Sequence, residues 1–117
     1  MEQVKIPSAV EIFGYFVGTF EEVVRPFLEE KEYDFACMAI NDLYDRHQMV
    51  SRDINLKVGV SGGCYHNAVV ELKSFCDAKD KDSDRAQLVL SMARRNIAEL
   101  DLILSGNEEY ESQRQRS

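Results

Sequence analysis

The chain has 117 residues, of which 44% are hydrophobic and 30% are charged, and it contains six glycines and two prolines. This length and composition are typical of one globular domain, and they exclude collagen-like, proline-rich and intrinsically disordered chains. The net charge of −7 argues against binding of nucleic acids or anionic membranes through phosphate neutralisation, but permits a protein partner with a basic surface.

The N-terminal residues predict neither export nor a membrane anchor. They lack the basic segment and cleavage site of a signal peptide. The longest mainly apolar run, from Ala9 to Phe20, is shorter than the about 20 residues of a membrane-spanning helix. Three irregularly spaced cysteines, Cys37, Cys64 and Cys76, then indicate reduced thiols that pack as small hydrophobic side chains in a cytoplasmic protein.

A first helix is predicted after Pro7. Ser8 and Glu11 have the spacing of a capping box, in which the serine hydroxyl accepts a hydrogen bond from the glutamate amide. Apolar residues follow at steps of three and four: Phe13, Phe16, Val17, Phe20, Val23, Val24, Phe27 and Leu28. Because the ring of Pro26 opposes the carbonyl four residues earlier, we expect this helix to be kinked or broken at Arg25–Pro26.

A second helix is predicted after the acidic run from Glu29 to Asp34. Its apolar stripe comprises Phe35, Ala36, Ala39, Ile40, Leu43, His47 and Val50, with Met38, Tyr44 and Met49 widening it. From Ile54 to Val60 apolar residues alternate with polar or small ones, which is the period of a strand. We favour an extended linker over residues 54–60, the alternative being an edge strand that pairs with a second copy. Ser61-Gly62-Gly63 then predicts a flexible break.

Two further helices are predicted, one from about Cys64 to Ala78 and one with the apolar seam Ala86, Val89 or Leu90, Ala93, Ile97, Leu100 and Leu104. Asp82 or Ser83 is expected to cap the last helix at its start, and Gly106 at its end. The whole pattern predicts an all-α, antiparallel four-helix bundle over residues 1–106, followed by a mobile polar tail over residues 107–117.

Metal and cofactor sites are not predicted. Cys37, His47, Cys64 and His66 are enough ligands for zinc, but they lack the close paired spacing of zinc sites. The acidic segment from Asp80 to Asp84 has neither the glycine nor the glutamate that a calcium-binding loop requires, so its carboxylates are expected to cap the last helix. We therefore expect no metal and no cofactor.

One cysteine supplies the strongest enzymatic hypothesis. Cys64 follows Gly62-Gly63 and lies near His66, and a glycine-rich turn before a helix can lower the pKa of a thiol. The sequence carries no nucleophile-elbow or phosphate-loop motif beside it. A thiol-dependent enzyme or redox sensor that uses Cys64, with His66 nearby, is therefore an alternative function.

Two glycines on the first predicted helix, Gly14 and Gly18, have a spacing that lets helices approach closely. Since each glycine weakens a helix by about 0.5–1 kcal/mol relative to alanine, a tight contact is expected to compensate. That contact is either packing within the bundle or the interface of a homodimer. A structural subunit of a homo-oligomeric assembly is therefore a second alternative function.

The strongest surface signal is acidic. Between Glu21 and Asp45 eight acidic and two basic side chains give a net charge of −6, most of the charge of the whole chain. Such a surface beside aromatic side chains can dock onto a basic partner and accelerate association. The leading prediction is a small protein that acts by protein–protein interaction, as an adaptor, inhibitor or immunity-like regulator. Its expected contact residues are Glu29, Glu30, Glu32, Tyr33 and Asp34.

Overall fold

The computed structural model describes residues 8–50 and 59–105, and all regular structure in those two ranges is helical. The elements follow in the order α1 (Ala9–Thr19), η1 (Phe20–Val24), α2 (Arg25–Glu29), α3 (Tyr33–Val50), α4 (Gly59–Asp77) and α5 (Asp84–Leu104). The predictions of an all-α class and of a helical bundle are thus confirmed. Residues 106–117, which include the predicted cap Gly106 and polar tail, lie outside the described ranges.

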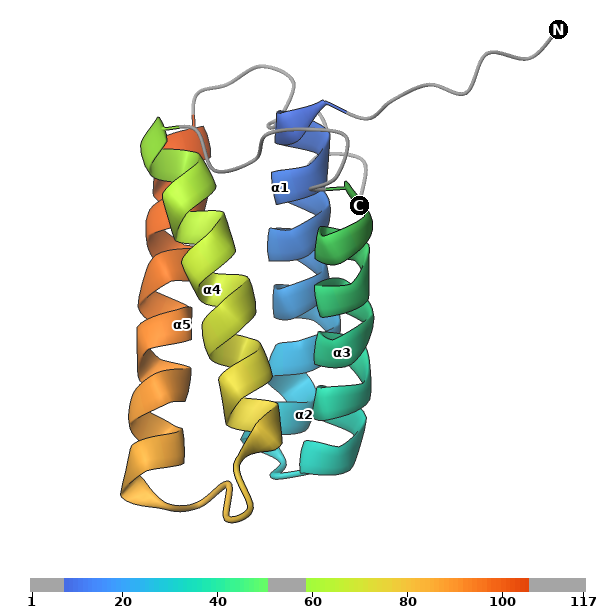
Figure 1. The fold of residues 1–117 in the computed structure, drawn as a ribbon, viewed down its shortest axis with the longest axis vertical. Coiled ribbons are helices and arrows are strands. Elements are labelled where there is room, and N and C mark those ends of the chain that lie inside the picture. The colour runs from blue at the N-terminus through green and yellow to red at the C-terminus, as the bar shows by residue number, and fades with distance from the viewer. Residues whose placement is uncertain (1–7, 51–58, 106–117) are drawn as a thin grey trace, which may run out of the picture.

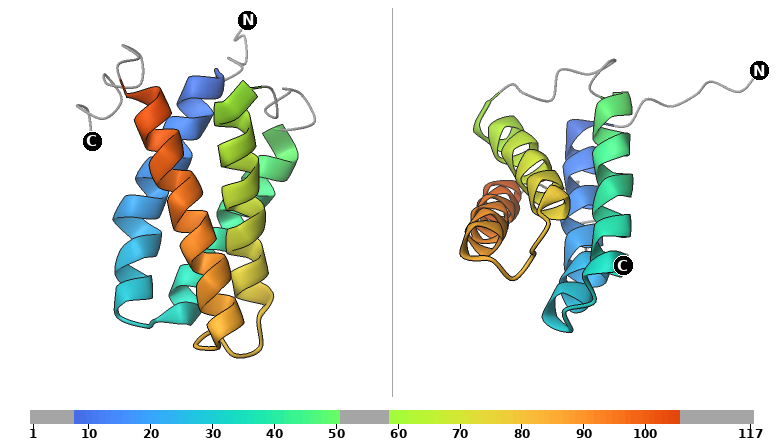
Figure 2. Two further views of the ribbon diagram at one scale, coloured as in Figure 1. Left: turned by 90° about the vertical axis from the view of Figure 1, so that its left-hand side faces the viewer. Right: turned by 60° about the horizontal axis from the view of Figure 1, so that its bottom comes forward.

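The elements stand side by side as a bundle (Figure 1). The continuous column α1–η1–α2 packs against α3, and α4 packs against both α3 and α5. The contacts of α5 are mainly with α4 and to a lesser extent with α1, so α3 and α5 stand on opposite sides of the molecule (Figures 1 and 2). Each of these two helices therefore has one long face directed away from the core.

The core is built from the apolar stripes of all the long helices. Its largest fully buried apolar side chains are Phe16, Phe75, Ile40, Leu72, Ile97 and Leu100. Three alanines with no exposed surface, Ala36, Ala68 and Ala93, contribute small side chains to it. Small residues on buried helix faces let neighbouring helices approach closely, whereas large ones fill the space between them.

The first helix starts as predicted, because the Ser8 hydroxyl accepts a hydrogen bond from the backbone N–H of Glu11 at 3.1 Å. Its regular α-helical pattern ends earlier than Pro26, at Thr19, and a π-helical turn over Phe20–Val24 follows. There the backbone N–H of Arg25 donates to the carbonyl of Phe20, five residues back. Pro26 lies in the first turn of α2, where its missing N–H costs nothing. The bend itself stays a prediction.

The turn between α2 and α3 is closed by a residue in the left-handed conformation, Lys31, with φ 56°. The backbone N–H of Lys31 donates to Leu28 O at 3.1 Å, and that of Glu32 donates to Phe27 O at 2.8 Å. This pair of bonds is the Schellman motif, whose left-handed position is usually occupied by glycine. The turn before α3 therefore contains a lysine in a strained backbone conformation.

Lys31→Gly is expected to raise the free energy of unfolding by about 0.5–1 kcal/mol, since glycine adopts this conformation without a Cβ clash. The exposed ion pair between Lys31 and Asp82, 3.6 Å apart, contributes little and is lost. Urea denaturation checks the change. Glu30→Gly is the matched control, because Glu30 has φ −87° and gains nothing from glycine. A Lys31→Gly protein less stable than the wild type would contradict the assignment.

The prediction of a flexible break at Ser61-Gly62-Gly63 is wrong, because these residues lie inside α4, which starts at Gly59. Of the segment 54–60, residues 54–58 lie outside the described ranges, while Gly59 and Val60 are helical. Glycines weaken an isolated helix, but burial of an apolar face supplies most of the stability of helices in proteins. Here that face includes Tyr65 and Val69, which are 3% and 2% exposed.

The last helix follows its predicted pattern. The Ser83 hydroxyl accepts a hydrogen bond from the backbone N–H of Ala86 at 3.1 Å, so Ser83 is the N-cap. The structure buries Leu90 and leaves Val89 partly buried, and the other residues of the predicted seam from Ala86 to Leu104 are buried. In the turn before it, the Asp80 carboxylate accepts the backbone N–H of Asp82 at 3.0 Å, a local bond that stabilises the turn. Within the described ranges, no helix is long and apolar enough to cross a membrane.

Candidate functional site

The predicted acidic contact residues gather at the turn between α2 and α3. Arg25 forms ion pairs with two glutamates, with Glu29 at 3.0 Å and with Glu21 at 2.7 Å. Glu30, Glu32 and Asp34 are exposed, and none of the three forms an ion pair with another described residue. Their carboxylates are the part of the acidic run that is open to a partner.

Tyr33 differs from its acidic neighbours, because it links the start of α3 to the turn before α5, at the same end of the bundle (Figure 1). Its hydroxyl donates to the Asp82 carboxylate at 2.7 Å, and its ring meets that of Phe75 edge-on, with centroids 5.7 Å apart. The hydrogen bond to Asp82 raises the pKa of Tyr33, and the same bond lowers the pKa of Asp82. The structure thus gives Tyr33 a contact inside the protein, between the start of α3 and the turn before α5.

A second group of exposed residues continues along α3, and we call it the α3 outer face. It consists of Phe35, Met38, Asp42, Asp45 and Met49, spaced by three and four residues. The three apolar side chains are 55%, 68% and 66% exposed. The face lies opposite the buried stripe of Ala36, Ile40, Leu43 and His47. The prediction that Phe35, Met38 and Met49 belong to the buried stripe is therefore wrong.

Charge and aromatic contacts give this face its chemical character. Asp42 forms an ion pair with Arg46 at 3.0 Å, whereas Asp45 forms none with another described residue. The Phe35 ring stacks on that of Phe27 of α2, with centroids 5.4 Å apart, so the apolar surface reaches the acidic turn. The α3 outer face and the carboxylates of Glu30, Glu32 and Asp34 therefore adjoin.

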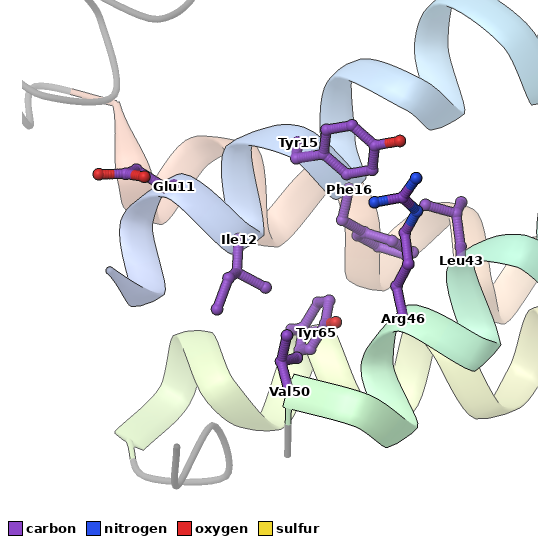
Figure 3. Close-up of a pocket in the computed structure, with 8 residues that line it drawn as sticks. All are labelled: Glu11, Ile12, Tyr15, Phe16, Leu43, Arg46, Val50 and Tyr65. Carbon is purple, nitrogen blue, oxygen red and sulfur yellow. The ribbon is translucent and has the colours of Figure 1, made fainter. Parts of the chain in front are cut away.

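A pocket of about 300 Å³ lies between α1, α3 and α4 (Figure 3). Its lining is mainly apolar and comprises Glu11, Ile12, Tyr15, Phe16, Leu43, Arg46, Val50 and Tyr65. The Arg46 guanidinium lies 5.0 Å from the centre of the Tyr15 ring, while its Nε donates to Asp42. This volume is at the lower end of the range for ligand pockets. Because residues of three helices line this pocket, no local sequence pattern indicates it.

The predicted thiol site is in the interior of α4. Cys64 is 7% exposed, and burial, followed by the charge of Glu99, raises the pKa of its thiol. His66 lies two residues on, and its Nδ1 is 3.3 Å from Nε2 of the buried His47 on α3. Residues two apart on a helix point to different faces. The structure thus brings His66 to His47, and it does not lower the pKa of Cys64.

Sequence spacing missed a different pair of cysteines. The side chains of Cys37 on α3 and Cys76 on α4 share a hydrogen bond, and both are free and partly buried. Burial, and then this bond, raises the pKa of Cys76. One turn away along the same helix pair, Lys73 Nζ donates to the Asn41 side chain at 2.9 Å. The two cysteines are 39 positions apart in the sequence, and only the packing of α3 on α4 brings them together.

Alkaline pH is expected to destabilise the fold through Tyr65. Burial raises its pKa to about 12, above the usual value near 10. The stabilisation by its neutral hydroxyl is complete below pH 10 and is lost as the pH rises from 10 to 12, a change of about 2 kcal/mol. Urea denaturation at several pH values measures it. In Tyr65→Phe this part of the loss disappears, whereas Tyr15→Phe, at a half-exposed ring, should retain it. Equal pH dependence in the wild type and Tyr65→Phe would contradict it.

The predicted close packing at the glycines of α1 is not seen at Gly18, because a Cβ there would meet no atom within 4 Å. The homodimer through Gly14 and Gly18 stays a prediction. Among the described residues, no group of three or more histidine, cysteine, aspartate or glutamate side chains could hold a metal ion.

No family model, no curated protein and no solved structure matches the chain.

Proposed function

We propose that the protein acts by protein–protein interaction, as an adaptor, inhibitor or immunity-like regulator whose acidic helical surface docks a partner with a basic surface. The observation that carries this proposal is the α3 outer face, where three large apolar side chains, each more than half exposed, share one helix face with two carboxylates. Phe35 and Met38 are neighbours on that face, and exposed apolar side chains that lie together are more characteristic of binding sites than scattered single residues.

The chemistry of the face specifies the partner. Met38 and Met49 offer flexible apolar contacts on either side of Asp42 and Asp45. An amphipathic helix with apolar residues and lysine or arginine at matching steps would satisfy both kinds of side chain. Glu30, Glu32 and Asp34 at the end of the face add attraction at longer range, which speeds encounter and depends on salt.

Self-association does not suit this face. Two copies of α3 paired in opposite directions, in the register that opposes Met38 to Met49, also oppose Asp42 to Asp45. Two parallel copies oppose each aspartate to itself. Both arrangements place like charges together, which is destabilising. A basic partner of a different sequence removes that repulsion.

The remaining parts of the proposal rest on composition. The net charge of −7 supports a protein without a nucleic-acid partner, and the three free cysteines support a cytoplasmic location. A thiol-dependent enzyme at Cys64 gains no support, since burial raises the pKa of that thiol. A structural subunit joined through Gly14 and Gly18 remains an alternative, since Gly18 has open space beside it within the chain.

The test uses quantitative capture from native lysate, followed by titration of the captured protein, once purified, against variants. Phe35→Ala/Met38→Ala removes the apolar half of the face, and Glu32→Lys/Asp45→Lys reverses charges beside it. Glu22→Lys/Asp77→Lys is the control, with the same change in net charge at two exposed residues elsewhere, of which Asp77 also loses an exposed ion pair with Lys73. We expect both face variants to weaken binding at least about tenfold, equivalent to about 1.4 kcal/mol, and the control to bind normally. A partner that binds all four proteins equally would refute the proposal.

A further inference from the structure

A second row of exposed residues follows the outward face of α5. This helix stands on the other side of the molecule from α3 (Figure 2). We call this row the α5 seam. It consists of Leu88, Met92, Arg95, Glu99 and Leu102, at steps of four, three, four and three residues. Leu88, Met92 and Leu102 are 62%, 47% and 74% exposed. Arg95 and Glu99 are also exposed, and neither forms an ion pair with another described residue.

These steps are those of the two contact positions in a coiled coil. They lie opposite the seam that α5 buries in its own bundle, which runs from Ala86 to Leu104. One face of α5 therefore packs in the core, and the opposite face has the residue spacing needed to pack against another helix. From Leu88 to Leu102 this second face is about 21 Å long.

The order of residues along the seam is self-complementary when two copies run in opposite directions. A two-fold axis at the level of Ile97 places Arg95 level with Glu99 of the second copy, and Glu99 level with its Arg95. The same axis places Met92 level with Leu102 of the second copy, and Leu102 level with Met92 of the second copy. Two ion pairs at the centre are thus flanked by two apolar layers, with no like charges opposed. Such reciprocity is what a two-fold interface requires.

Other pairings of the same helix lack this match. Two parallel copies would oppose arginine to arginine and glutamate to glutamate. Two copies paired through the α3 outer face would oppose carboxylates in either direction. Charge complementarity therefore selects the antiparallel arrangement of α5 with α5.

We propose that the α5 seam is a self-association site, through which two copies of this chain pair by antiparallel contact of their α5 helices. The contact leaves the α3 outer face of each copy open, so a dimer would present two docking surfaces for the basic partner. This site is separate from Gly14 and Gly18 on α1. Because one helix from each copy forms it, its area is small for a permanent interface, and we expect concentration-dependent pairing.

Sedimentation equilibrium over about 10 µM to 1 mM tests the proposal, since this range brackets the weak affinities of small interfaces. The wild type should approach twice the 13.4 kDa mass of one chain at the upper end. Arg95→Glu and Glu99→Arg each oppose like charges across the axis, and each should weaken pairing at least about tenfold. The double variant Arg95→Glu/Glu99→Arg restores opposite charges and should restore pairing. A mixture of the two single variants should also pair, as a heterodimer.

This design separates the seam from its alternatives. Circular dichroism checks that the variants, all at exposed positions, remain folded. Gly18→Ala should pair like the wild type, whereas a loss of pairing there would place the interface on α1. A wild type that stays at the 13.4 kDa mass of one chain at every concentration would overturn the proposal. A seam covered by another segment of the same chain would give this result. Pairing that both single variants leave unchanged would also overturn it.

Discussion

Replacement of Phe75 by alanine is expected to lower the free energy of unfolding by about 3–5 kcal/mol, a large part of the about 5–15 kcal/mol that holds a domain of this kind folded. Phe75 has no exposed surface, and its ring contacts that of Tyr33 at the junction of α3, α4 and the turn before α5. This loss has two parts. The removed ring atoms no longer contribute the free energy of burial away from water, and they leave a cavity that the packed helices cannot close. Urea denaturation measures it.

Phe35→Ala is the matched control, the same substitution at a ring 55% exposed on the α3 outer face. Its stability should fall by less than about 1 kcal/mol, from the loss of stacking on Phe27. The contrast matters for function, because a large exposed aromatic that contributes little to stability is available for a partner. Equal losses in the two variants would show that α3 does not direct Phe35 away from the core.

Replacement of Ala93 by leucine is expected to cost about 1–3 kcal/mol. Ala93 has no exposed surface and lies on the face of α5 that packs against α4, so added methylene groups force helices apart or force strained rotamers. Thermal unfolding followed by circular dichroism measures the change. Ala98→Leu makes the same substitution at an exposed position of the same helix and should change stability by less than about 0.5 kcal/mol. An Ala93→Leu protein as stable as the control would contradict the packing of α5.

The parts of the fold that depend on local signals could be predicted from the sequence. Ser8 and Ser83 cap helices because a serine hydroxyl at that position satisfies a free backbone N–H, and this needs no tertiary information. The π-helical turn before Pro26 and the helical conformation of Gly62 and Gly63 could not be predicted. At Gly62 and Gly63, packing of apolar side chains from distant segments outweighs the local preference of glycine.

The candidate site shows a second limit. Both α3 and α5 carry two apolar stripes, and periodicity alone does not say which stripe faces the core. Ile40 and Met38 are two residues apart, yet one is 1% and the other 68% exposed. The carboxylates of Glu30, Glu32 and Asp34 were evident in the sequence, whereas the apolar half of the surface required the arrangement of the helices. The meeting of Cys37 with Cys76 likewise depends on how α3 and α4 pack.

The central claim is that a basic partner docks on the α3 outer face, and methionine methyl NMR tests it most directly. The chain has four methionines, of which Met38 and Met49 lie on the α3 outer face and Met92 lies on the α5 seam. At constant protein concentration, addition of the purified partner is predicted to shift the methyl signals of Met38 and Met49 and to leave that of Met92 in place. A partner that shifts Met92 alone, or that binds without moving Met38 and Met49, would contradict the account.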